Sequence, residues 1–272
     1  MRVHTVEGGG GVKLRVRESG SESGRPILLM HGWSQNLRAW EMQYESPRLK
    51  GFRLVAFDLR GHGESEAPAK AEAYTDGELW ADDIAAIIRA LKLRKPILAG
   101  WSYGGFMISD YVRKYGEGQI SGINFVSGAV ILGPKAFGTL IGPGFLENAP
   151  DACNPDPAIN RAAIDRFLRV FVAKPLPKGT LDATRAFNLM VSPQVRGFLL
   201  QRELDYTDVL EKLTVPVLVT HGRADTVLLP AMAEYILDHC KSAKASWFDG
   251  VGHAPFLEDP ERFNSELAKF AG

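Results

Sequence analysis

A single serine stands between glycines in the stretch ILAGWSYGGF, which spans residues 97–106. The five residues from Gly100 to Gly104 have the form Gly-x-Ser-x-Gly and follow an apolar run. Such a turn between a strand and a helix holds its serine in a strained conformation, with no neighbouring side chains to cover the hydroxyl. The helix N-terminus also favours developing negative charge. The pattern therefore predicts that Ser102 is a nucleophile.

A nucleophilic serine needs a base, and the base needs an acid that orients it. The stretch VTHGRADTVLLP supplies Asp225 after an apolar strand, and FDGVGHAPF supplies His253 after the strand Ser246–Phe248. Asp249 is a rival acid, but it lies four residues before His253 and would struggle to reach the distal ring nitrogen. The chain order serine, acid, histidine suits a hydrolase triad. We predict a triad of Ser102, Asp225 and His253.

The oxyanion of an acyl-transfer reaction needs two N–H donors. One is expected from Tyr103, directly after the serine. The other is expected from the loop HGWSQN, which follows the strand Ile27–Met30. There Gly32 allows a close backbone approach, and we assign the donor to the N–H of Trp33.

Aromatic residues flank these positions and predict an apolar substrate pocket formed by Trp33, Trp101 and Phe256. The same side chains could equally be core packing. His31, His62 and His221 do not form a cluster with metal-ligand spacing, so neither a metal nor a cofactor is predicted. The glycine run Gly8–Gly11 lacks the Lys-Ser/Thr of a phosphate loop and indicates a turn between two strands.

The elements that must position these residues follow from apolar runs. The runs PILLMHG, FRLVAFD, KPILAGW, INFVSG and PVLVTHG indicate strands buried on both faces, as in a parallel sheet covered by helices. Between them, residues 76–91 have a helical apolar period, with Thr75 or Asp76 as the N-cap. A final helix is expected to begin at Pro260. The fold class is therefore α/β, with a doubly wound, mostly parallel sheet.

The alternation is interrupted between residues 130 and 213, where no strand is indicated and prolines separate short helical pieces. We predict a core made of residues 1–129 and 214–272, with a helical cap or lid of residues 130–213 inserted between the sixth and seventh strands. Such an insertion would cover the carboxyl edge of the sheet, where ligands bind in these folds.

Together these motifs resemble the α/β-hydrolase fold superfamily. The resemblance depends on HGWSQN, DLRGHGES, GWSYGG, HGRADTV and GHAPFLEDPERFN, and it covers nearly the whole chain. Some motifs look like the carboxylesterases that cleave pimeloyl-carrier-protein methyl ester. DLRGHGES looks more like the cofactor-free haloperoxidases and arylesterases. Within it, Asp58, Arg60 and His62 are interpreted as structural.

The triad and the resemblance imply a serine hydrolase that cleaves a carboxylic ester of a small or medium, apolar substrate through an acyl-enzyme intermediate. Three alternatives stay open. The same triad serves C–C bond hydrolases and enol-lactonases, and a hydroxynitrile-lyase-like enzyme would use it as an acid–base device. A ligand receptor would bind in the pocket without turnover.

Charge and cysteine content limit the partners. Lys+Arg and Asp+Glu both total 32, so nothing points to nucleic acid or to a membrane surface. Two distant cysteines suggest free thiols and a cytoplasmic protein. An acidic carrier protein could dock on the basic residues of the cap, although a solvated helix face with an Asp165–Arg169 pair explains them as well. Those basic residues are Arg161, Arg166, Arg169, Lys174 and Lys178.

Overall fold

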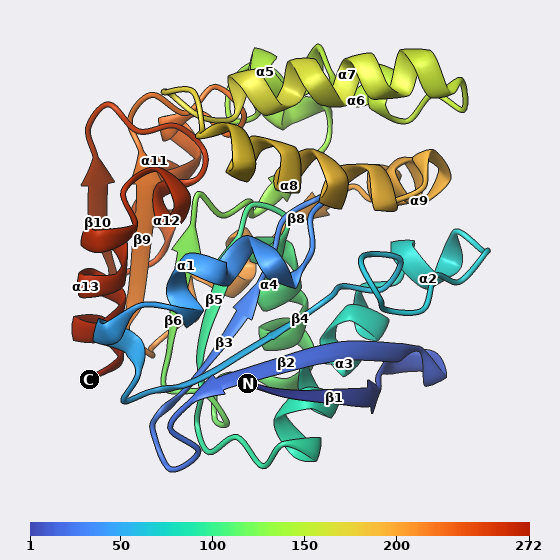
Figure 1. Cartoon of the computed structure of the whole chain (residues 1–272). Coiled ribbons are helices and arrows are strands. Elements are labelled where there is room, and N and C mark those ends of the chain that lie inside the picture. Colours follow the sequence, from blue (N-terminus) through green and yellow to red (C-terminus); the bar gives the residue numbers. More distant parts are fainter.

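An eight-stranded sheet forms the centre of the computed structural model, which describes all residues from 1 to 272 (Figure 1). The strand order is β1-β2-β4-β3-β5-β6-β9-β10. β2 pairs antiparallel with β1 and β4, and the pairs from β4 to β10 are parallel. The strands are β1 Arg2–Glu7, β2 Lys13–Gly20, β3 Pro26–Met30, β4 Arg53–Phe57, β5 Ile97–Trp101, β6 Gly122–Val126, β9 Val217–Gly222 and β10 Ala243–Phe248. The predicted fold class is confirmed.

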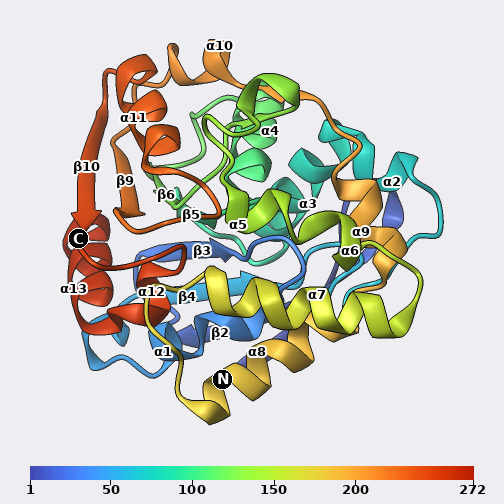
Figure 2. The same cartoon turned by 90° about the horizontal axis from the view of Figure 1, so that it is seen from above.

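Helices cover both faces of this sheet, as Figure 2 shows from above. One face carries α3 Gly77–Ala90, α4 Gly104–Tyr115 and α11 Pro230–His239, and the other carries α1 Glu41–Tyr44, α12 Pro255–Glu258 and α13 Pro260–Ala271. Every residue of β3, β5 and β6 is buried, which explains their continuous apolar sequence. Two further short helices are α2 Glu72–Thr75, before α3, and α10 Thr207–Leu210, before β9.

Local sequence sets where the helices begin. The carboxylate of Asp76 accepts a hydrogen bond of 2.8 Å from the N–H of Glu78 and caps α3, so Asp76 is the predicted N-cap. α13 begins at Pro260 as predicted, and the side chain of Asp259 caps it.

Six α-helices lie between β6 and β9 in the chain, and all of them except α10 lie above the carboxyl ends of the strands (Figure 1). These five are α5 Pro143–Leu146, α6 Ala149–Ala152, α7 Pro157–Val170, α8 Lys178–Met190 and α9 Pro193–Leu199. The expectation of no strand between residues 130 and 213 was wrong, because β7 Ile131–Leu132 pairs with β8 Leu204–Asp205. Two-residue strands are too short to leave a period in the sequence. The division into core and cap stays a prediction.

The expectation of an ion pair between Asp165 and Arg169 within α7 was also wrong. Asp165 accepts a hydrogen bond of 2.5 Å from Arg185 of α8 rather than one from Arg169. α7 packs against α8, so the carboxylate has a partner across the helix interface that the sequence spacing could not show.

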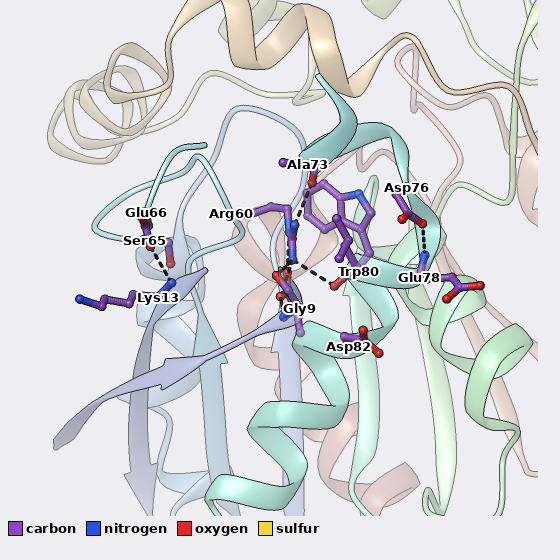
Figure 3. Close-up of polar contacts among 12 residues, drawn as sticks. Gly9, Lys13, Arg60, Ser65, Glu66, Ala73, Asp76, Glu78, Trp80 and Asp82 are labelled. Carbon is purple, nitrogen blue, oxygen red and sulfur yellow. Dashed lines mark hydrogen bonds and ion pairs between the residues drawn. The ribbon is translucent and has the colours of Figure 1, made fainter. Parts of the chain in front are cut away.

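The glycine run forms the predicted turn, which the buried Arg60 fastens to the core (Figure 3). The Arg60 guanidinium donates to the two carboxylate oxygens of Asp83 at 2.7 and 2.8 Å. It also donates to the carbonyl oxygens of Gly9 at 3.0 Å and Ala73 at 2.8 Å. These contacts join the β1–β2 turn to α2 and α3, so Arg60 is structural, as interpreted from the sequence.

Replacing Arg60 by leucine is expected to lower the free energy of unfolding by about 3–5 kcal/mol, because the carboxylate of Asp83 would remain buried without its cation. Urea unfolding of wild type and Arg60→Leu at pH 7 measures this change. Arg223→Leu is the control, since its ion pair with Asp249 lies at the surface and should contribute less than about 1 kcal/mol. Equal losses in both variants would contradict the structural role of Arg60.

Candidate active site

Ser102 forms the turn between β5 and α4 with φ at +54°, a left-handed conformation that disfavours side chains. Its N–H donates to the carbonyl oxygens of Val126 and Ser127 at the end of β6, both at 3.1 Å. A Cβ at Gly100 would lie 2.5 Å from the carbonyl oxygen of Gly104, so only glycine fits there. The Gly-x-Ser-x-Gly spacing thus produces the strained turn that it predicts.

The predicted acid and base meet in the structure. Asp225 follows β9, His253 follows β10, and both side chains are buried. The Nδ1 of His253 lies 2.7 Å from Oδ2 of Asp225. The other carboxylate oxygen accepts the N–H groups of Val227 at 2.8 Å and Leu228 at 3.0 Å. The proton on Nδ1 is therefore fixed toward Asp225, which leaves Nε2 of His253 to accept another.

A second histidine contacts the same carboxylate. The Nε2 of His221 lies 3.3 Å from Oδ2 of Asp225 and 2.9 Å from the carbonyl oxygen of Leu228. Burial alone would raise the pKa of Asp225, but the charge and hydrogen bonds of His253 and His221 outweigh it and hold this pKa below its usual value. Asp225 is thus ionised at neutral pH. Sequence reasoning missed the contact of His221 with Asp225, although both residues belong to the same HGRAD motif.

The base is fastened to the residue directly before Ser102. The indole Nε1 of Trp101 donates to the carbonyl oxygen of His253 at 2.8 Å, and the two ring centroids are 5.6 Å apart. The N–H of His253 donates to the carbonyl oxygen of Phe171 at 2.7 Å. The structure therefore brings the base loop against the serine turn.

The carboxylate of Glu258 holds the backbone on both sides of the base. It accepts the N–H groups of Gly252 at 2.9 Å, Ala254 at 3.3 Å and Ala173 at 2.7 Å. Burial raises the pKa of Glu258, although these three N–H groups oppose the shift. Sequence reasoning missed this residue as well. Its signal was its position in GHAPFLEDP, shortly after His253.

The two expected oxyanion donors have no competing partner. The backbone N–H groups of Trp33 and Tyr103 donate to no acceptor within the protein. A Cβ at Gly32 would lie 3.0 Å from the Cβ of Ser102, so the absence of a side chain lets this loop approach the serine. Trp33, Ser102 and Tyr103 line one small, almost wholly apolar cavity of about 30 Å³. Two free donors thus border the cavity that contains the serine.

Two histidines join the Trp33 loop to the DLRGHGES loop. The Nε2 of His62 accepts the N–H of Ser34 at 3.2 Å, and the Nε2 of His31 accepts the N–H of Leu59 at 3.0 Å. His62 donates through Nδ1 to the carbonyl oxygen of Arg60 at 2.9 Å. His31 donates through Nδ1 to the carbonyl oxygen of Gly32 at 2.8 Å. Both rings must be neutral to accept at Nε2. His62 is structural as interpreted, and it supports the loop of Trp33, from which an oxyanion donor is expected.

The structure is expected to lose stability in acid through His62. Burial, together with the charge of the neighbouring Arg196, lowers the pKa of His62 to about 4, although the hydrogen bond to the carbonyl oxygen of Arg60 opposes the shift. An unfolded histidine has a pKa of about 6.5, so between about pH 6.5 and 4 His62 is protonated in the unfolded chain and neutral in the folded one. The free energy of unfolding therefore falls as the pH drops through this range. Urea unfolding of His62→Gln should show a shallower fall over this window.

Above pH 7 wild type and His62→Gln should have equal pH slopes, which serves as the internal control. Equal slopes between pH 6.5 and 4 as well would contradict the assignment of this proton to His62. Burial and the nearby His62 also lower the pKa of His31, so some acid sensitivity should remain in the variant.

The three predicted pocket residues do not share one cavity. Trp33 lines the small cavity at Ser102, where its ring contacts Phe145 edge-on. Trp101 and Phe256 line a separate cavity of about 290 Å³. The rings of Trp101 and Phe256 also pack against each other at 4.9 Å between centroids. These two residues are therefore both core and cavity wall.

No group of histidine, cysteine and acidic side chains could hold a metal ion. No helix has the length and apolar character that crossing a membrane requires. Both cysteines, Cys153 and Cys240, are free thiols.

Comparison with known proteins identifies the relatives of this architecture. The sequence model of the alpha/beta hydrolase family matches residues 27–266. The chain shares 33% sequence identity with an esterase from Rhodococcus sp. ECU1013, whose crystal structure is known. The two structures match with a TM-score of 0.92, and the match covers 100% of this chain and 98% of the esterase. A non-heme haloperoxidase of Rhodococcus erythropolis is 26% identical over 91% of this chain and 92% of its own length. A pimeloyl-[acyl-carrier protein] methyl ester esterase of Vibrio cholerae is 27% identical, over 92% and 96% respectively.

Proposed function

This chain belongs to the alpha/beta hydrolase family, and from that premise we propose that it is a carboxylic ester hydrolase acting through an acyl-enzyme on Ser102. The resemblance stated from the motifs is confirmed, and relatives that are esterases support a hydrolase. The observation that carries the finer proposal is the buried Asp225–His253 pair of 2.7 Å, held against the serine turn by Trp101.

In the proposed first half-reaction, Nε2 of His253 takes the hydroxyl proton of Ser102 as the oxygen attacks the ester carbonyl. The oxyanion that forms accepts hydrogen bonds from the free N–H groups of Trp33 and Tyr103. His253 then gives the proton to the departing alcohol. Asp225 keeps the imidazole in the required tautomer and stabilises its charged form.

In the second half-reaction, His253 removes a proton from water, which attacks the acyl group on Ser102. The acid leaves and the serine recovers its proton. The cavity beside Ser102 has a lining that includes Phe106, Leu132 and Ile141, and it measures about 30 Å³. Such a cavity suits a small apolar acyl group.

An acidic carrier protein remains a further proposal for the cap. Two of the five basic side chains have acidic partners there, because Arg166 lies 2.7 Å from Asp151 and Lys178 lies 2.7 Å from Asp182. The other three, Arg161, Arg169 and Lys174, form no such ion pair. The carrier would therefore meet a smaller positive charge than the sequence suggests.

The proposal is tested with an organophosphonate probe and short-chain p-nitrophenyl esters. Wild type should hydrolyse the esters and gain the mass of one phosphonyl group, and peptide mapping should place it on Ser102. Ser102→Ala should gain none. Hydrolysis without any label on Ser102 would exclude the acyl-enzyme and favour a lyase-like acid–base role. An inert, unlabelled wild type would favour a ligand receptor.

A further inference from the structure

Arg196 is a buried cation that the proposed mechanism does not use. It belongs to α9, which lies beside α6 in Figure 2. Its Nε donates to the hydroxyl oxygen of Ser34 at 2.7 Å, and its Nη1 donates to the carbonyl oxygen of Ala152 at 2.7 Å. Its Nη2 donates to the carbonyl oxygen of Asn188. These acceptors are uncharged, and no carboxylate forms an ion pair with the guanidinium. Arg196 is therefore fully buried without a counterion.

Stability alone does not account for this arginine. A cation is costly to bury when no anion compensates it, and an uncharged side chain of similar length would avoid that cost. Burial accordingly lowers the pKa of Arg196 to about 10. Two of its acceptors are carbonyl groups in the last turns of α6 and α8, which lack partners within a helix. The remaining acceptor, the hydroxyl of Ser34, lies outside these helices and indicates what the guanidinium holds.

Ser34 belongs to the turn that carries an expected oxyanion donor. The turn is closed by the N–H of Gln35, which donates to the carbonyl oxygen of Gly32 at 3.3 Å. Ser34 is its third residue and has φ at +61°, a left-handed value that favours glycine or asparagine. Arg196 holds the hydroxyl of Ser34, and His62 accepts its N–H at 3.2 Å. The shape of the turn depends on such contacts, because serine alone disfavours this conformation.

The residue before Ser34 is held by the same arginine. The indole Nε1 of Trp33 donates to the backbone carbonyl oxygen of Arg196 at 3.2 Å. Arg196 thus binds two consecutive residues of the turn, one through its side chain and one through its backbone. The backbone N–H of Trp33 donates to no acceptor, and Trp33 lines the cavity that contains Ser102. A shift of the turn would move this N–H away from the oxyanion, and hydrogen bonds weaken steeply when they are misaligned.

We propose that Arg196 is a positioning residue for ester hydrolysis, which holds the turn of residues 32–35 so that the N–H of Trp33 meets the oxyanion. The inference rests on the ester hydrolysis proposed above. The oxyanion forms only when the serine attacks, so a displaced donor lowers kcat and leaves KM nearly unchanged. Removal of a whole donor costs about 10²–10³ in rate, and displacement of one should cost less.

Arg196→Met keeps the length of the side chain and removes its charge and donors. With p-nitrophenyl acetate, kcat should fall about 10–100-fold and KM should change less than about twofold. The inhibitor trifluoroacetophenone adds Ser102 to its carbonyl while His253 takes the proton, and its oxyanion meets the same donors. Its Ki should rise by a similar factor. Arg185→Met is the matched control, because this arginine binds only acidic side chains of α7 and α8, and it should keep the wild-type kcat and Ki.

Ser34→Ala removes the same contact from the other side and leaves the charge of Arg196 in place. It should lower kcat and raise Ki as Arg196→Met does, and it carries the test alone if Arg196→Met does not fold. The double variant should have a kcat within about twofold of the poorer single variant, because both substitutions delete one shared contact. Losses that multiply would overturn the action of Arg196 through Ser34.

The remaining outcomes separate this inference from the proposed function. If wild type cleaves esters and the single variants have a lower Tm but the wild-type kcat and Ki, Arg196 is only structural. The positioning role is then excluded while the hydrolase stands. If wild type cleaves no ester, the proposed function and this inference both fail.

Discussion

Replacement of Ser102 by alanine is expected to lower kcat for ester hydrolysis by about 10⁶, leaving only what the oxyanion donors and binding supply. The reason is that no other hydroxyl can take its place in the strained turn between β5 and α4. Steady-state kinetics with a p-nitrophenyl ester measure the loss, with the uncatalysed rate subtracted. A variant that keeps more than a tenth of the wild-type rate would show that Ser102 is not the nucleophile.

Folding of the Ser102 variants is checked by a second substitution. Ser102 has φ of +54°, which glycine adopts without strain, so Ser102→Gly should have a Tm at least as high as wild type. It should be as inactive as Ser102→Ala. This combination of retained stability and lost turnover separates a catalytic role from a structural one, because a residue needed only for folding would lower Tm.

Replacement of Asp225 by asparagine is expected to lower kcat by about 10⁴. The asparagine oxygen can still accept the N–H groups of Val227 and Leu228, so the turn should be kept. Its amide nitrogen would then face Nδ1 of His253, 2.7 Å away, where it can donate but not accept. The imidazole would be held in the tautomer that protonates Nε2, and it could not take the serine proton.

The matched control for Asp225→Asn is Asp249→Asn. Asp249 is the other carboxylate near His253 in the sequence, but its side chain is 86% exposed and pairs with Arg223. Its replacement should change kcat by less than about twofold. Circular dichroism and Tm of both variants report whether the folds are retained. A large loss in Asp249→Asn with little loss in Asp225→Asn would reverse the assignment of the acid.

Several parts of this site follow from the sequence because they depend on local residue spacing or on where the strands end. The spacing of Gly100, Ser102 and Gly104 requires the strained turn. Parallel strands end at the same edge of a sheet, so residues that follow β5, β9 and β10 had to lie near one another. Asp225 and His253 could therefore be paired before any coordinates, although 28 positions separate them.

Tertiary packing decided the rest, because its contacts join residues that no sequence period relates. Asp165 could have paired with Arg169 on its own helix, but the packing of α7 against α8 gave it Arg185. Trp33 and Trp101 looked like walls of one pocket, and the structure places them in two cavities. The sequence by itself determined the fold class, and it predicted the pairing of Asp225 with His253. Only the three-dimensional packing decided that Gln35 would be buried with its amide Nε2 unpaired, because burial depends on contacts between segments that lie far apart in the chain.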